Sequence, residues 1–110
     1  MTRRDATYRS ENPDLSTVQS APGWVLLDFG TDWCGYCSAA REHVDRWLDG
    51  RSHVEHWRVE DGRGRALGRA FRIKLWPTLV LLHAGREITR VVRPGAAGDL
   101  LPLEEALGLR

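Results

Sequence analysis

Cys34 and Cys37 are the two cysteines of this 110-residue chain, and only two residues separate them. A disulfide that closes so short a loop restricts few unfolded conformations, so it contributes little to folding stability. Small secreted scaffolds instead carry many widely spaced cysteines. The thiolate form of cysteine is, however, the nucleophile of disulfide exchange. We therefore predict that this pair is a reactive redox site and not a structural crosslink.

The position of the pair in the chain favours the same chemistry. An apolar run at 24–29 has the length of a strand, and the pattern after it predicts a helix from Cys34 to about Asp49. Unpaired backbone N–H groups and the helix dipole favour negative charge at a helix N-terminus, so we expect a lowered pKa for the Cys34 thiol. Cys37 follows about 300° further round the helix. The spacing predicts an exposed nucleophile, Cys34, and a more deeply buried resolving thiol, Cys37.

A zinc site and a purely structural thiol pair are the alternative interpretations of these cysteines. Zinc sites in proteins usually have four ligands, and the sequence contains no second cysteine pair. His43 lies about 180° round the predicted helix from Cys34, so it faces elsewhere. The helix-terminal position argues against inert thiols. We therefore expect neither a metal nor an organic cofactor.

The elements that must position the cysteines are separated by glycine and proline. A tight turn at 84–86 joins two of the strand-like runs into a hairpin, and we expect the last helix to be capped by Asp99. Strands are predicted at 24–29, 54–59, 78–82 and 88–92, and helices are predicted to begin near residues 13, 34, 66 and 99. Strand, helix, strand, helix, hairpin and helix describe an α/β sandwich, with helices on both faces of a mixed sheet.

Length and composition limit the classes of protein further. A chain of 110 residues with 42% hydrophobic residues fits one compact domain. We expect 1–12 to be a polar, flexible segment with at most a short edge strand at 6–9, followed by a folded domain over 13–110. A net charge of +1 argues against general nucleic-acid or acidic-membrane binding. No apolar run follows Arg3 and Arg4, so we expect a cytoplasmic protein, or an exported one if a leader has been removed.

Three separated features give the chain a resemblance to a known family. Asp28 interrupts the first apolar run, Trp33-Cys34-Gly35-Tyr36-Cys37 follows that run, and Trp76-Pro77-Thr78 precedes the third run. From Leu15 onward the chain resembles the thioredoxin family. The resemblance implies that 13–110 form a thioredoxin-like three-layer sandwich and that the protein is a thiol-disulfide oxidoreductase.

The resemblance also implies a mechanism and partners. The Cys34 thiolate attacks a substrate disulfide, and Cys37 then resolves the mixed disulfide. The implied partners are protein disulfide substrates and a thiol reductase as electron donor, without nucleic acid or membrane, and we expect a monomer. The implied substrate-binding residues, with a cis peptide bond before the proline, are Trp33, Gly35, Tyr36, Trp76 and Pro77.

Asp28 is a third candidate catalytic residue. A carboxylate inside an apolar strand is costly to bury with its charge, so we expect it to take up a proton more readily than an exposed one. Such an acid suits deprotonation of the resolving thiol, and the family places an acid behind the second cysteine. We therefore assign proton transfer to Asp28 and expect Asp28→Asn to stabilise the fold. Arg58 matches a family lysine and would hold Asp28 ionised if the two pair, whereas His56 is assigned to the surface or a strand end.

The chain departs from the family pattern at several positions. Tyr36 replaces the proline usual between the cysteines, Gly30 stands where a tryptophan is usual, and Glu42 stands where the helix normally has a proline. A Gly-Tyr pair between the cysteines also occurs in periplasmic disulfide isomerases, and this dipeptide affects the reduction potential. Two alternatives therefore stay open: an exported disulfide isomerase or oxidant, and a binding module whose contact is switched by redox state.

Overall fold

The helices and strands lie where the apolar runs predicted them. The structure, a computed structural model, describes residues 2–108. In chain order its elements are α1 (Leu15–Ser20), β1 (Trp24–Gly30), α2 (Gly35–Leu48), β2 (Val54–Glu60), α3 (Ala66–Ala70), β3 (Thr78–His83), β4 (Arg86–Val92), η1 (Ala97–Leu100) and α4 (Leu101–Gly108).

The helices differ from expectation only at the last one. A short 3-10 helix, η1, precedes α4, and Asp99 inside η1 accepts hydrogen bonds from the backbone N–H groups of Gly95 and Ala96 at 2.8 and 3.1 Å. Asp99 therefore caps the turn before the helix rather than the helix itself. A separate observation concerns helix length. The helix α2 has 14 residues, and among residues 2–108 no helix is both long enough and apolar enough to span a membrane.

β1 occupies the interior of a four-stranded mixed sheet with the order β2-β1-β3-β4. It runs parallel to β2, where Asp28 stands beside Arg58 in the register, and antiparallel to β3. All of its residues except Trp24 are buried, as expected for a strand covered on both faces. β3 and β4 form the predicted hairpin. The carboxyl end of β1 therefore leads directly into the segment that carries the cysteines.

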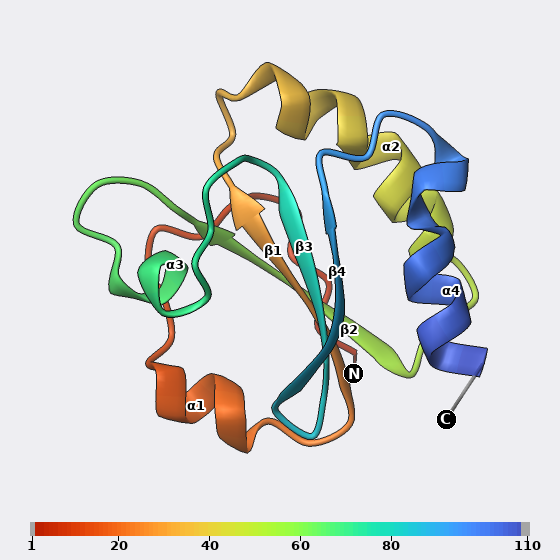
Figure 1. Ribbon diagram of the computed structural model, residues 1–110, viewed down its shortest axis with the longest axis horizontal. Helices are drawn as coiled ribbons and strands as arrows, with labels where there is room; N and C mark the ends of the chain where they lie inside the picture. Colours follow the sequence, from red (N-terminus) through yellow and green to blue (C-terminus); the bar gives the residue numbers. More distant parts are fainter. Residues whose placement is uncertain (1, 109–110) are drawn as a thin grey trace.

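Helices cover both faces of this sheet, α2 and α4 on one face and α1 and α3 on the other (Figure 1). Successive residues of a strand point to opposite faces. Leu26 therefore packs beneath α2 and α4, whereas Leu27 packs in the second core with residues of α1 and α3. Asp28 follows the alternation of Leu26 and faces α2. This arrangement confirms the predicted three-layer α/β sandwich.

The N-terminal segment lies along the free edge of β2. The backbone N–H groups of Asp5 and Arg9 donate to the carbonyls of His56 and Arg58 at 3.1 and 3.0 Å, so the segment pairs like a short parallel strand. Asp5 and Tyr8 are buried. The polar composition predicted a frayed segment with a short edge strand at 6–9. The segment does pair along the edge of β2, because this strand offers open hydrogen-bonding groups that the segment satisfies.

Candidate active site

Cys34 and Cys37 lie at the junction of β1 and α2. Cys34 is the N-cap residue of α2, with φ of −86° and ψ of 124°, and Cys37 follows in the first turn. Both are free thiols, and only 9% of Cys34 and 4% of Cys37 are exposed. The prediction of an exposed nucleophile is therefore wrong in this detail, because Tyr8 and Trp76 pack against the pair.

Electrostatics distinguish the two thiols more than exposure does. Burial opposes ionisation of Cys34, but several groups outweigh it: the backbone N–H and the thiol of Cys37, the backbone N–H of Tyr36, and the charge of Arg93. Their combined effect lowers the pKa of the Cys34 thiol. A lowered pKa raises the thiolate fraction at neutral pH, so Cys34 is the better nucleophile of the pair.

Cys37 shows the opposite behaviour. Burial raises the pKa of the Cys37 thiol to about 11, and the neighbouring Cys34 adds to the rise. The Thr31 backbone and the nearby Tyr8 hydroxyl act in the other direction without cancelling it. Cys37 is thus protonated at neutral pH and must lose its proton before it can attack a disulfide.

Asp28 lies beneath α2 in a buried polar network. Its Oδ1 accepts a 2.7 Å hydrogen bond from the Tyr8 hydroxyl, and its Oδ2 lies 2.9 Å from His56 Nε2 and 3.5 Å from Arg58 Nε. All four side chains are buried. The sequence predicted a costly buried carboxylate and left open whether Arg58 pairs with it. The structure shows that Arg58 does pair with Asp28, and the ion pair and the hydrogen bonds offset the cost of burying the charge.

An aromatic rim surrounds the outer side of the cysteine pair. Trp33 is 76% exposed and Tyr36 is 58% exposed. Trp76 packs edge to face against Trp33, with ring centroids 5.7 Å apart, and also packs against the buried cysteines. The Trp76 indole N–H donates to Asp61 Oδ2 at 2.9 Å, which fixes the orientation of the ring. The rim therefore presents apolar surface beside the nucleophile.

Arg93 completes this rim from the residue after β4. Its guanidinium lies 3.9 Å from the centroid of the Tyr36 ring, and its Nε donates to the Trp76 carbonyl at 2.8 Å. Its backbone N–H donates to the Pro77 carbonyl at 2.8 Å, and the Trp76–Pro77 peptide bond is cis. Arg93 has a φ of 49°, a left-handed conformation that residues with a Cβ seldom adopt. These contacts hold a positive charge beside Cys34.

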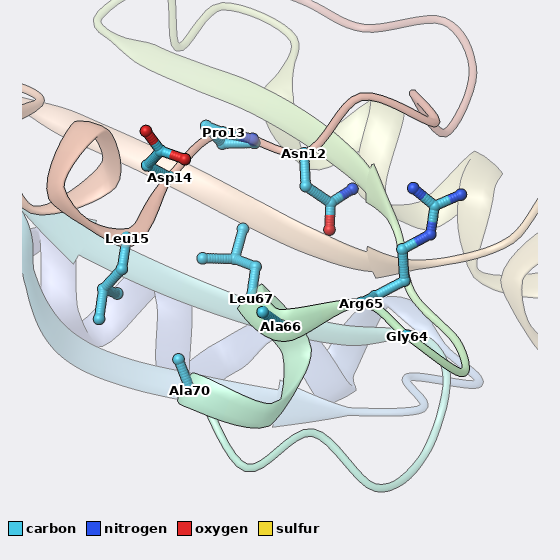
Figure 2. A pocket seen from close by; sticks show the side chains of 9 residues that line it. All are labelled: Asn12, Pro13, Asp14, Leu15, Gly64, Arg65, Ala66, Leu67 and Ala70. Atoms are coloured by element: carbon cyan, nitrogen blue, oxygen red, sulfur yellow. The ribbon is translucent and has the colours of Figure 1, made fainter.

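A pocket of about 430 Å³ lies away from the cysteines, between the start of α1 and α3 (Figure 2). None of its lining side chains is a thiol or an imidazole; they are Asn12, Pro13, Asp14, Leu15, Gly64, Arg65, Ala66, Leu67 and Ala70. Within residues 2–108, no three histidine, cysteine or acidic side chains gather as a metal-binding group. We therefore place the chemistry at the cysteine pair.

The structure gathers the predicted site residues around this pair. Asp28 lies on the inner side of the pair, Gly35 is the first residue of α2, and the outer side is formed by Trp33, Tyr36, Trp76 and Pro77. The sequence analysis missed Tyr8, Arg93 and the burial of His56. Tyr8 is a large aromatic residue in a polar segment, and Gly30 is a residue without a side chain at the end of an apolar strand. Together they could have indicated that the Tyr8 ring fills the space beside Gly30. The alternation of Val54, His56 and Arg58 could have placed His56 on the face of Asp28.

A thiol of lowered pKa at a helix N-terminus, followed by a thiol of raised pKa one turn later, defines a dithiol–disulfide oxidoreductase on an α/β sandwich. The family model for thioredoxin matches residues 8–102. The chain therefore belongs to the thioredoxin family, and it is a protein thiol-disulfide oxidoreductase.

Individual relatives agree with this assignment. Thioredoxin 2 from Pseudomonas aeruginosa PAO1, solved in its reduced form, is 44% identical with a TM-score of 0.85, over 97% of this chain and 100% of that one. Thioredoxin Asp f 28 of Aspergillus fumigatus is 28% identical over 88% of this chain and 87% of its own. Thioredoxin H2-1 of Oryza sativa subsp. japonica is 35% identical over 70% of this chain and 54% of its own. These similarities confirm the predicted family and activity and do not favour the isomerase, oxidant or binding-module alternatives.

Proposed function

We propose a division of labour among the residues of this oxidoreductase. The Cys34 thiolate attacks one sulfur of a substrate disulfide, that bond breaks, and the other substrate sulfur leaves as a thiolate. Cys37 then loses its proton and attacks the Cys34 sulfur. The Cys34–Cys37 disulfide forms, and the second substrate sulfur leaves as a thiolate. The substrate disulfide thereby gains two electrons, and a thiol reductase returns two electrons to the cysteine pair.

The opposite pKa directions of the two thiols are the observation that carries this order of attack. Cys34 has a lowered pKa and is ready to attack, whereas Cys37, with a pKa of about 11, needs a proton acceptor. The Asp28 carboxylate is buried on the inner side of the pair, where water has little access. In our proposal Asp28 accepts the Cys37 proton during resolution, as a general base.

The rim residues bind the substrate protein in the same proposal. The exposed faces of Trp33 and Tyr36 pack against apolar side chains beside the substrate disulfide, since aromatic rings bury much apolar area with few rotatable bonds. Gly35 adds no side chain at the start of α2: a Cβ placed there would meet no atom within 4 Å. Trp76 and Pro77 complete the surface from the opposite side.

We further propose that the partners are protein disulfides and a separate thiol reductase, and that the protein acts as a monomer. Reducing conditions in the cytoplasm keep a cysteine pair of this kind available for disulfide reduction, so the cytoplasm is its proposed location. The net charge of +1 supports protein substrates over nucleic acid.

Stopped-flow reaction of the reduced protein with 5,5′-dithiobis(2-nitrobenzoate) separates the two steps. The first burst of thionitrobenzoate reports attack by Cys34, and the second reports resolution by Cys37. We expect Asp28→Asn to leave the first burst within about twofold of the parent and to slow the second by about 100-fold, because general base catalysis contributes on that scale.

Asp45→Asn is the matched control for this experiment. Asp45 also pairs with Arg58, at 3.0 Å, but it is half-exposed on the surface of α2. The control should therefore resolve at the parent rate. Equal second-burst rates for Asp28→Asn and the parent, from about pH 6 to about pH 9, would remove Asp28 from the mechanism.

A further inference from the structure

Tyr8 hydrogen-bonds to Asp28 and packs in the same buried cluster as Cys37. Its hydroxyl donates to Asp28 Oδ1 at 2.7 Å, and both this hydroxyl and the Cys37 thiol lie over Gly30. Among residues 2–108, no direct hydrogen bond joins the Cys37 thiol to the Asp28 carboxylate. Tyr8 is 7% exposed, so solvent has little access to this bridge. The Tyr8 hydroxyl is therefore the side-chain group through which a proton could pass from Cys37 to Asp28.

Gly30 makes room for this bridge. A Cβ built on Gly30 would lie 2.6 Å from Cys37 Sγ, 2.8 Å from Tyr8 Cζ and 2.9 Å from the Tyr8 hydroxyl oxygen. The Cys37 thiol and the Tyr8 phenol therefore both pack against the backbone of Gly30. A side chain at this position would displace one or both of them. The small residue in β1 and the aromatic residue in the N-terminal segment complement each other.

The surroundings of Tyr8 hold the phenol in place. Its backbone N–H donates to Asp32 Oδ1 at 3.0 Å, and the next residue, Arg9, hydrogen-bonds to β2. The guanidinium of Arg58 lies 5.9 Å from the centroid of the Tyr8 ring. A side chain fixed from the loop before α2 and from β2 keeps the geometry that a proton transfer requires.

We propose that the Tyr8 hydroxyl relays the proton from the Cys37 thiol to the Asp28 carboxylate during resolution of the mixed disulfide. The inference rests on the proposed role of Asp28 as proton acceptor. Cys37 gives its proton to the Tyr8 oxygen while the Tyr8 proton passes to Asp28 Oδ1, so Tyr8 ends as a neutral phenol. The Cys37 sulfur bonds to Cys34, and the bond from Cys34 to the substrate sulfur breaks with its electron pair on the substrate.

The two transfers are concerted. Burial, the Asp28 carboxylate and the hydrogen bond to it raise the pKa of the Tyr8 phenol. A free tyrosinate is therefore too costly to form as an intermediate, and Tyr8 must receive one proton as it gives up the other. Besides Asp28 and Cys37, the titratable or charged groups around Tyr8 are Cys34 at the start of α2, Asp32 from the loop before α2, and His56 and Arg58 from β2.

Tyr8→Phe tests the relay, since it keeps the ring against Gly30 and removes only the hydroxyl. With the same two-burst assay, we expect the first burst to stay within about twofold of the parent and the second to slow by at least about tenfold. The second burst should also rise tenfold for each pH unit, because direct deprotonation of Cys37 by hydroxide replaces the relay. A role confined to packing would slow both bursts or neither and would leave the pH profile unchanged.

The double variant separates this proposal from the role of Asp28. Adding Tyr8→Phe to Asp28→Asn should slow the second burst no further than Asp28→Asn alone, since the relay then has no acceptor. A parent-like Tyr8→Phe beside a slow Asp28→Asn would overturn the relay and leave Asp28 as the base. Independent losses that multiply in the double variant would also overturn the relay. Parent-like rates in both single variants would overturn the relay and the role of Asp28 together.

Discussion

The two sides of the cysteine pair provide opposite environments for a thiol. The outer side is aromatic and accessible, with exposed Trp33 and Tyr36 and the positive charge of Arg93. The inner side is closed and polar, with Asp28 and Tyr8 hydrogen-bonded beneath α2. The outer groups stabilise a thiolate, whereas the inner burial keeps a proton on its thiol.

This difference explains how two identical side chains acquire different tasks. Two thiols in the same environment would ionise to the same extent at neutral pH, and neither would be the preferred nucleophile. In the proposed mechanism the substrate disulfide approaches the Cys34 thiolate from the outer side, while the proton of Cys37 leaves toward the interior. In that mechanism the substrate and the proton acceptor lie on opposite sides of the cysteine pair.

Replacing each cysteine in turn is the strongest test of this asymmetry. Both Cys34→Ser and Cys37→Ser should reduce insulin with dithiothreitol no faster than the reaction without protein, because each removes one of the two sulfurs that exchange. Only Cys37→Ser should accumulate mixed disulfides with other proteins, measured by non-reducing electrophoresis and mass spectrometry. If Cys34→Ser were the variant that traps partners, nucleophile and resolving thiol would be exchanged.

The variant Asp28→Asn tests whether the buried polar contacts on the inner side stabilise the folded protein. The sequence alone predicted a more stable variant, but the observed partners reverse the sign, since the variant leaves the buried Arg58 without the charge of Asp28. We expect the free energy of unfolding in urea to fall by about 2 kcal/mol. The half-exposed Asp45→Asn should cost less than about 1 kcal/mol. A variant more stable than the parent would restore the expectation from sequence.

The variant Arg93→Gln should produce the smallest effect of the three predictions. It tests whether the charge of Arg93 on the outer side lowers the pKa of Cys34. Loss of the positive charge raises the pKa of Cys34, so the midpoint of its alkylation by iodoacetamide should move up by about 0.3 pH unit. The parent midpoint lies below that of a free thiol. Arg46→Gln is the control, because Arg46 pairs with Glu42 on the exposed face of α2. Equal midpoints for Arg93→Gln and the parent would exclude Arg93 from the activation of Cys34.

The sequence was most informative where the physical cause is local. The run at 78–82 predicts a strand because aliphatic residues follow Thr78 without interruption, and it lies within β3. The direction of the pKa shift of Cys34 was also predictable, since backbone N–H groups at the start of the helix contribute to it. Such features depend on neighbours within a few residues along the chain.

The residues that were missed depend on contacts between distant segments. Tyr8 lies in a polar stretch without periodicity, and it is buried because that stretch pairs with β2. His56 meets Asp28 because of the register between β1 and β2, which the residue types of either strand do not specify. The backbone of Arg93 adopts a conformation that its residue type disfavours. In each case tertiary structure overrides the local pattern.

Pairing of the N-terminal segment with β2 also has a consequence in time. Asp5 accepts a hydrogen bond from the backbone of Arg58, 53 residues later in the chain. At about 5–20 residues per second, a ribosome adds these residues about 3–10 s apart. Before β2 emerges, Tyr8 has no strand edge on which to dock, although Cys34 and Cys37 have already been made. The nascent chain therefore carries its two most reactive side chains before the tyrosine that closes over them can reach its place.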